Sequence, residues 1–145
     1  MATEGRGGNW PVGEAGPVSD EELTRHLQAF AQSFISSARR QRWQPKRLTV
    51  PTRNRDQMGK FYTQCDPRYC LRISWEDAAL RDIKARHGDA RCVYLDENGL
   101  GIAISLCAGI DRALHDFTDA IISIIPGKLA LMISHDGVRW LCSRP

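Results

Sequence analysis

The second half of the chain contains two pairs of short apolar runs, and each pair is joined by a sequence typical of a tight β-turn. Residues 91–96 and 100–107 flank Glu97-Asn98-Gly99, and residues 129–134 and 138–142 flank His135-Asp136-Gly137. Asn-Gly and Asp-Gly favour the positive φ angles that close a β-hairpin. Two hairpins are therefore predicted, and they favour a mostly antiparallel sheet.

A first helix is predicted over residues 20–40. Ser19 stands three residues before Glu22, which is the spacing of a capping box, and Arg39 and Arg40 suit the negative C-terminal end of a helix. Apolar side chains recur at helical spacing, so that one face of the helix is expected to pack on the sheet. These residues are Leu23, Leu27, Phe30 and Phe34.

Two further helices are predicted. Ser74 and Asp77 repeat the capping spacing before a helix that ends at Gly88, with an apolar stripe of Trp75, Ala79, Leu80 and Ile83. A third helix is expected at residues 110–125, before Pro126-Gly127, with an apolar face of Ile110, Leu114, Phe117, Ile121 and Ile125.

The first half offers weaker strand signals. Pro45 and Pro51 bracket a short segment that could form an edge strand, and residues 69–73 also favour a strand. Together these patterns predict an α+β fold, in which about three helices pack on one face of a mostly antiparallel sheet of about four to six strands.

Residues 74–145 are then expected to run helix, hairpin, helix, hairpin. This α-β-β-α-β-β order resembles the opening of the roadblock/profilin-like proteins. The resemblance rests on the order of elements, and it implies a module that scaffolds other proteins through dimerisation.

Composition predicts one domain over residues 19–145, preceded by a disordered, Gly- and Pro-rich tail at residues 1–18. The start shows no signal-peptide pattern, and no apolar stretch is long enough to span a membrane. The five scattered cysteines are therefore interpreted as free thiols of an intracellular protein, cytoplasmic or nuclear.

Positive charge is concentrated in one segment. Residues 39–72 contain ten bases and two acids, a net charge of +8, whereas residues 1–38 carry −3 and residues 73–145 carry −2. Trp43, Phe61, Tyr62 and Tyr69 are interleaved with these bases. Arg and Lys neutralise phosphates, and aromatic rings stack on unpaired bases.

The leading hypothesis is therefore a non-enzymatic protein that binds RNA or DNA through this segment, without a cofactor. The residues expected to make contact are Arg39, Arg40, Arg42, Trp43, Lys46, Arg47, Arg53, Arg55 and Lys60. The same bases could pair with an acidic partner protein, so the alternative is a regulatory or inhibitory interaction module that self-associates as a homodimer.

The cysteines suggest two other kinds of site. Cys65, Cys70, His87 and Cys92 have the composition of a tetrahedral zinc site, but their inner spacings are wider than usual. The sequence has no glycine-rich turn that would carry a nucleophile and no cysteine at a predicted helix start, so catalysis by a cysteine is not favoured. Buried structural thiols are the favoured interpretation, with no metal.

The histidines are expected to be structural. In the predicted third helix Asp111, His115 and Asp119 would lie on one line, which is typical of a solvated helix face. His26 lies beside the apolar stripe of the first helix, and His135 lies in the second hairpin turn.

Overall fold

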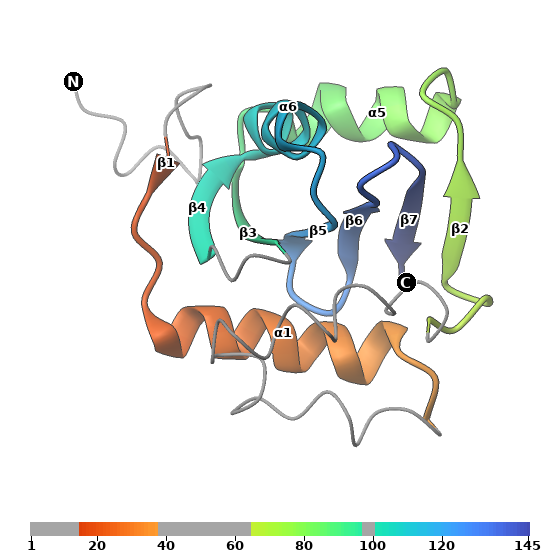
Figure 1. Ribbon diagram of the computed structural model, residues 1–145. Helices are drawn as coiled ribbons and strands as arrows, with labels where there is room; N and C mark the ends of the chain where they lie inside the picture. Colours follow the sequence, from red (N-terminus) through yellow and green to blue (C-terminus); the bar gives the residue numbers. More distant parts are fainter. Residues whose placement is uncertain (1–14, 38–64, 97–100) are drawn as a thin grey trace.

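A computed structural model describes residues 15–37, 65–96 and 101–145, and these form an α+β fold with an antiparallel sheet. Within the described residues the sheet has seven strands in the order β1-β4-β3-β5-β6-β7-β2, and every neighbouring pair is antiparallel (Figure 1). The predicted fold class is confirmed, with slightly more strands than expected. The strands are β1 (Ala15–Gly16), β2 (Cys70–Ile73), β3 (Arg91–Asp96), β4 (Gly101–Ser105), β5 (Ala120–Ile125), β6 (Leu129–Ile133) and β7 (Arg139–Ser143).

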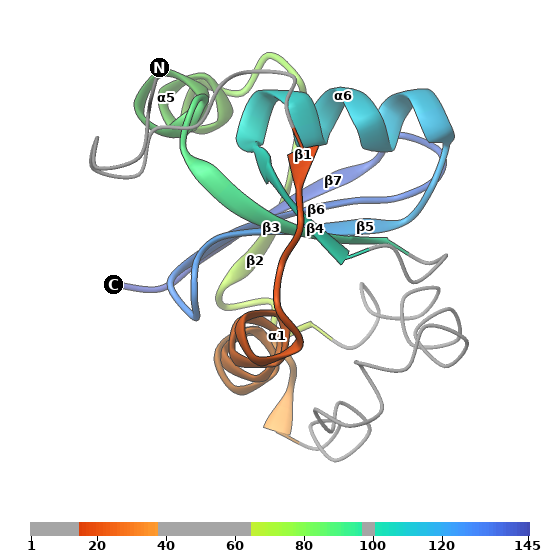
Figure 2. The ribbon, with the colours of Figure 1, turned by 90° about the vertical axis from the view of Figure 1, so that its left-hand side faces the viewer.

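The helices cover both faces of the sheet, so the prediction that they share one face was wrong. Helix α1 (Asp20–Phe34) lies on one face, and α5 (Ala78–His87) and α6 (Leu106–Asp116) lie on the other (Figure 2). The strands explain this arrangement. Residues 120–124 of β5 and 92–96 of β3 are buried without interruption, which is the pattern of strands covered on both sides.

The α1 face was largely predictable. The Ser19 hydroxyl accepts a hydrogen bond from the Glu22 amide at 3.0 Å, and all four stripe residues are buried against the sheet. The helix ends at Phe34, however, and not near residue 40. Ile35 is extended and forms an isolated β-bridge with Cys65, so the backbone after the helix pairs with the segment that leads into β2.

The second face is built on α5 and α6. Leu80 and Ile83 of α5 are buried in the core as predicted, and Gly88 caps the helix end. The N-cap is Asp77 and not Ser74, because its carboxylate accepts a hydrogen bond from the Ala79 amide at 2.8 Å.

The predicted helix over residues 110–125 is wrong in its second half. Helix α6 begins after Ser105, whose hydroxyl accepts a hydrogen bond from the Ala108 amide at 3.3 Å, and ends at Asp116. Residues 120–125 form β5, which pairs with both β3 and β6. Three strands therefore follow α6, and residues 74–145 have the order α-β-β-α-β-β-β.

The strand pairings of both predicted hairpins are confirmed, β3 with β4 and β6 with β7, and so is the strand at residues 69–73. The predicted tail reached residue 18, but Ala15 and Gly16 pair with β4 as β1. The expected edge strand between Pro45 and Pro51 lies outside the described residues, as do residues 1–14 of the tail.

Among the residues that the structure describes, no helix combines the length and the apolar character needed to cross a bilayer.

Candidate binding surface at the β2–β7 end of the sheet

The residues predicted to contact nucleic acid, Arg39 to Lys60, lie outside the described part of the chain. The structure does describe the last part of the basic segment, residues 65–72, which carries Arg68 and Arg72. It leads into β2, which is an edge strand of the sheet formed by the described residues and pairs with β7 within them.

The β2–β7 pairing brings further cations and aromatic rings next to the basic segment. Arg72 lies opposite Trp140, and Ile73 lies opposite Arg139. Arg144 follows the end of β7. Sequence reasoning missed these β7 residues, because they belong to a region of net negative charge and only a long-range strand pairing places them here.

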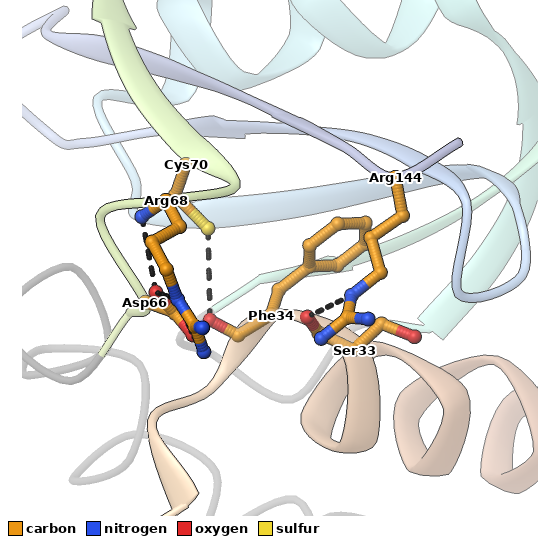
Figure 3. Close-up of polar contacts among 6 residues, drawn as sticks. All are labelled: Ser33, Phe34, Asp66, Arg68, Cys70 and Arg144. Carbon is orange, nitrogen blue, oxygen red and sulfur yellow. Dashed lines mark hydrogen bonds and ion pairs between the residues drawn. The ribbon is translucent and has the colours of Figure 1, made fainter.

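Tyr69 is contacted by two guanidinium groups. The Arg144 guanidinium carbon lies 3.9 Å from the centre of the Tyr69 ring, and that of Arg68 lies 5.2 Å from it. Arg144 is also tied to the end of α1, because its Nε donates a hydrogen bond to the Ser33 carbonyl at 3.0 Å (Figure 3). The packing holds these cations on an aromatic surface at the edge of the sheet.

Asp66 reduces the charge that Arg68 can offer to a ligand. The Arg68 Nη2 lies 2.7 Å from Oδ2 of Asp66, and its Nε donates to Oδ1 at 3.1 Å (Figure 3). Hydrogen bonds from Arg68 lower the pKa of Asp66 to about 2, so the carboxylate stays ionised. Arg72 and Arg144 are therefore the better candidates for binding an anion.

A second cation and aromatic cluster lies on the α5 face. The Arg139 guanidinium carbon lies 3.8 Å from the centre of the Trp75 ring, and Nζ of Lys84 lies 5.6 Å from it. Nε and Nη1 of Arg139 are buried, and no hydrogen-bond acceptor for them is found within the described residues. Burial lowers the pKa of Arg139. An acceptor supplied by a ligand would satisfy donors that the described fold leaves unmatched.

A small cavity adjoins Arg72 at the β6–β7 turn. Its volume is about 190 Å³, and it is lined by a guanidinium group, an indole ring, polar groups and the carboxylate of Asp136. The lining residues are Arg72, Ser134, His135, Asp136, Val138 and Trp140. A flat group of a larger ligand would find an indole ring and a guanidinium group there, whereas an anionic group would also meet the Asp136 carboxylate.

The structure does not bring the four residues of the zinc hypothesis together. Cys65 and Cys70 belong to the core on the α1 face, whereas Cys92 packs in the core on the α5–α6 face. Cys70 is in β2 and Cys92 is in β3, and three strands lie between β2 and β3 in the sheet, so spacing along the sequence is misleading here. Within the described ranges, no group of three or more His, Cys, Asp or Glu residues is arranged to hold a metal ion.

The line of Asp111, His115 and Asp119 does not exist, because α6 ends before Asp119. Asp119 is buried, and its carboxylate accepts a hydrogen bond from the His135 amide at 2.7 Å. His26 is buried against β5, where its Nδ1 lies 2.7 Å from the Ser123 hydroxyl. The position of His26 agrees with the structural role expected for it, whereas the His135 side chain is largely exposed and lines the cavity beside Arg72.

No protein-family model matches this chain, and the searches of curated proteins and of solved structures gave no match either.

Proposed function

We propose that this protein binds RNA or DNA through a basic, aromatic-containing surface. The surface would combine residues 39–60 with the β2–β7 end of the sheet. The observation that supports the proposal best is the β2–β7 pairing, which brings Arg72 and Arg144 from distant parts of the sequence to one end of the sheet, with Arg144 on the Tyr69 ring. Arg139 and Trp75 lie at the same end on the α5 face. Guanidinium groups bind phosphates with paired hydrogen bonds, and aromatic rings stack on bases.

Binding is proposed without catalysis and without a cofactor, in a reducing intracellular compartment, cytoplasmic or nuclear. The net charge of +8 over residues 39–72 would supply most of the affinity through counterion release. The buried, unmatched donors of Arg139 would add a directional contact. The alternative is that a self-associated form of this protein binds an acidic protein surface. The experiment must distinguish this alternative from nucleic-acid binding.

Fluorescence anisotropy with labelled single-stranded RNA, single-stranded DNA and duplex DNA tests the proposal. Affinity is expected to fall steeply between about 50 mM and about 200 mM salt, because each neutralised phosphate releases counterions. If none of the three nucleic acids is retained at about 50 mM salt, the proposal is wrong. Light scattering of the same samples reports self-association, which the alternative requires.

Single charge removals locate the surface. Arg72→Gln is expected to weaken binding and to reduce the slope of log affinity against log salt by about one. Arg25→Gln is the matched control, because Arg25 is exposed on the half of α1 far from β2 (Figure 1). Equal losses from both variants would indicate diffuse attraction to the whole protein and would contradict a localised surface.

Residues 39–60 require their own variant. Replacing Arg53 and Arg55 together by Gln is expected to weaken binding by more than Arg72→Gln alone, because two charges of the segment are lost. Unchanged affinity in the Arg53 and Arg55 variant would remove that part of the segment from the interface.

A further inference from the structure

Three cysteine side chains meet where β2 and β7 pair beneath α1. Cys70 of β2 and Cys142 of β7 are directly opposite each other in the antiparallel register. Both belong to the core on the α1 face, and Cys65 packs against the same core. Directly opposite residues have Cβ atoms about 4.5–5.5 Å apart, close to the separation of about 3.5–4.5 Å in a disulfide. All five cysteines of the chain are free thiols in the structure.

The surroundings of the three sulfur atoms differ. Hydrogen bonds from Cys142 and Cys65 lower the pKa of the Cys70 thiol. Burial raises the pKa of Cys142, and hydrogen bonding to Cys70 raises that of Cys65. Cys65 Sγ also lies 3.6 Å from Met132 Sδ, and Cys70 Sγ lies 3.6 Å from the Phe34 carbonyl oxygen (Figure 3). Cys70 lies on the edge strand and is the more accessible of the facing pair, with 7% exposure against 0% for Cys142, so we assign it as the sulfur that reacts first, once its thiol releases the Phe34 carbonyl oxygen.

We infer that Cys70 and Cys142 form a peroxide-sensitive dithiol that closes to a cross-strand disulfide. The Cys70 thiolate attacks one oxygen of a hydroperoxide, so that Cys70 becomes a sulfenic acid and the O–O bond breaks, releasing water or an alcohol once protonated. The Cys142 thiol then attacks the Cys70 sulfur, an S–S bond forms, and the sulfenic oxygen leaves as water. Two thiols are oxidised by two electrons, and the hydroperoxide is reduced.

The position of β2 gives the oxidant a route to this pair. Cys70 and Cys142 are both buried, but β2 is a four-residue strand at the edge of the described sheet. Short edge strands open locally at a lower free energy than central strands, so a small oxidant can reach Cys70 without global unfolding. This inference does not depend on the proposed nucleic-acid binding.

The other two cysteines provide an internal comparison. Cys92 packs in the core on the opposite face, where burial raises its pKa to about 12. Cys107 is half-buried at the start of α6, so the expectation that no cysteine begins a helix was wrong, but burial raises its pKa as well. Neither thiol belongs to the core that holds Cys70, and both should remain reduced under mild oxidation.

The experiment treats the purified full chain with increasing hydrogen peroxide, blocks free thiols with iodoacetamide and maps the peptides without reduction. The expected product has lost two hydrogens, carries three alkylated thiols of the five and contains a Cys70–Cys142 linkage. A linkage between Cys65 and Cys70, or preferential oxidation of Cys107, would overturn the assignment. This mapping uses the wild-type chain, so it does not depend on any variant folding.

Variants then distinguish the cysteine that attacks the hydroperoxide from the cysteine that closes the disulfide. In Cys142→Ala the sulfenic acid at Cys70 is expected to persist and to be trapped by dimedone, whereas Cys70→Ala should abolish the disulfide and leave Cys142 reduced. Cys107→Ser is the matched control and should form the Cys70–Cys142 linkage at the wild-type rate. If Cys142→Ala gives no more trapped sulfenic acid than the wild type, the proposed order of attack is wrong.

Discussion

His26 of α1 and Ser123 of β5 are joined by a buried polar contact of 2.7 Å through the core beneath the helix. Burial is the main cause that lowers the pKa of His26 below its ordinary value of 6.5, and the charges of Arg25 and Arg91 act in the same direction. Glu22 opposes them, because its carboxylate raises the pKa of His26. The fold therefore favours the neutral imidazole.

This contact predicts a loss of stability in mild acid. The folded-state pKa is the lower one, so protons bind more readily to the unfolded chain, and the contribution of His26 is complete above about pH 6.5 and declines below it. Urea unfolding of the wild type at about pH 7.5 and about pH 5.5 should show this decline. The fall should be smaller in His26→Gln, and an equal fall in both proteins would contradict the prediction.

Glu22 and Arg91 form a two-point ion pair that joins the start of α1 to β3. Arg91 Nη2 lies 2.8 Å from Oε1 of Glu22, and Nη1 contacts Oε2. Glu22→Gln is expected to lower the free energy of unfolding by about 1–2 kcal/mol, because a partly buried, charge-assisted pair is lost. A double-mutant cycle with Arg91→Gln measures the pair, and independent effects of the two substitutions would show that the contact does not contribute.

The ion pair between Glu22 and Arg91 also makes the stability of the protein depend on pH. The hydrogen bond from Arg91 lowers the pKa of Glu22 below its ordinary value of 4.5. The stabilisation is therefore complete above the unfolded-state pKa and is lost as the pH falls through the lower folded-state pKa. Glu22→Gln should remove part of the acid sensitivity of the protein below about pH 4.5.

Asp119 fixes the β6–β7 turn to the start of β5. Its carboxylate is almost fully buried and accepts a hydrogen bond from the His135 amide. Asp119→Ala is expected to cost about 1–3 kcal/mol, because the His135 amide loses its charged acceptor. Asp111→Ala is the matched control, since Asp111 is exposed on α6 and should change stability by less than about 0.5 kcal/mol. Similar losses from both substitutions, seen in urea unfolding, would contradict the role of Asp119.

Local signals in the sequence predicted the elements whose stabilising contacts are local. Ser19 and Glu22 marked the start of α1, and the Asn-Gly and Asp-Gly turns marked the β3–β4 and β6–β7 pairs. The error at residues 110–125 has a physical reason. Apolar residues of α6 and then of β5 happen to continue at helical spacing, whereas the state of residues 120–125 is decided by pairing with β3 and β6.

The candidate sites depended on contacts that local patterns do not contain. Charge density identified the segment that ends with Arg68 and Arg72, but the β2–β7 register adds Arg139 and Arg144 to it. The cysteines show the same limit. Spacing in the sequence grouped Cys70 with Cys92, whereas the strand order places them far apart on opposite faces of the sheet and the register pairs Cys70 with Cys142.

Phe117 occupies a backbone conformation that favours glycine. Its φ of 52° and ψ of 47° lie in the left-handed region just after α6, and its side chain is 75% exposed. An exposed ring gains little from packing, whereas a side chain in this region costs about 1 kcal/mol relative to glycine. Phe117→Gly should therefore leave stability unchanged or raise it by up to about 1 kcal/mol, and Phe117→Val should lower it.

Thermal unfolding of both variants checks this prediction, with the signs of the two changes as the readout. β-branched valine disfavours positive φ more strongly than phenylalanine does, so the two substitutions are expected to move the midpoint apart. Asp116→Gly is a suitable control, because it places glycine at the last position of α6, before the left-handed residue. Glycine inside a helix is destabilising, so stabilisation by Asp116→Gly, or destabilisation by Phe117→Gly, would refute the conformational explanation.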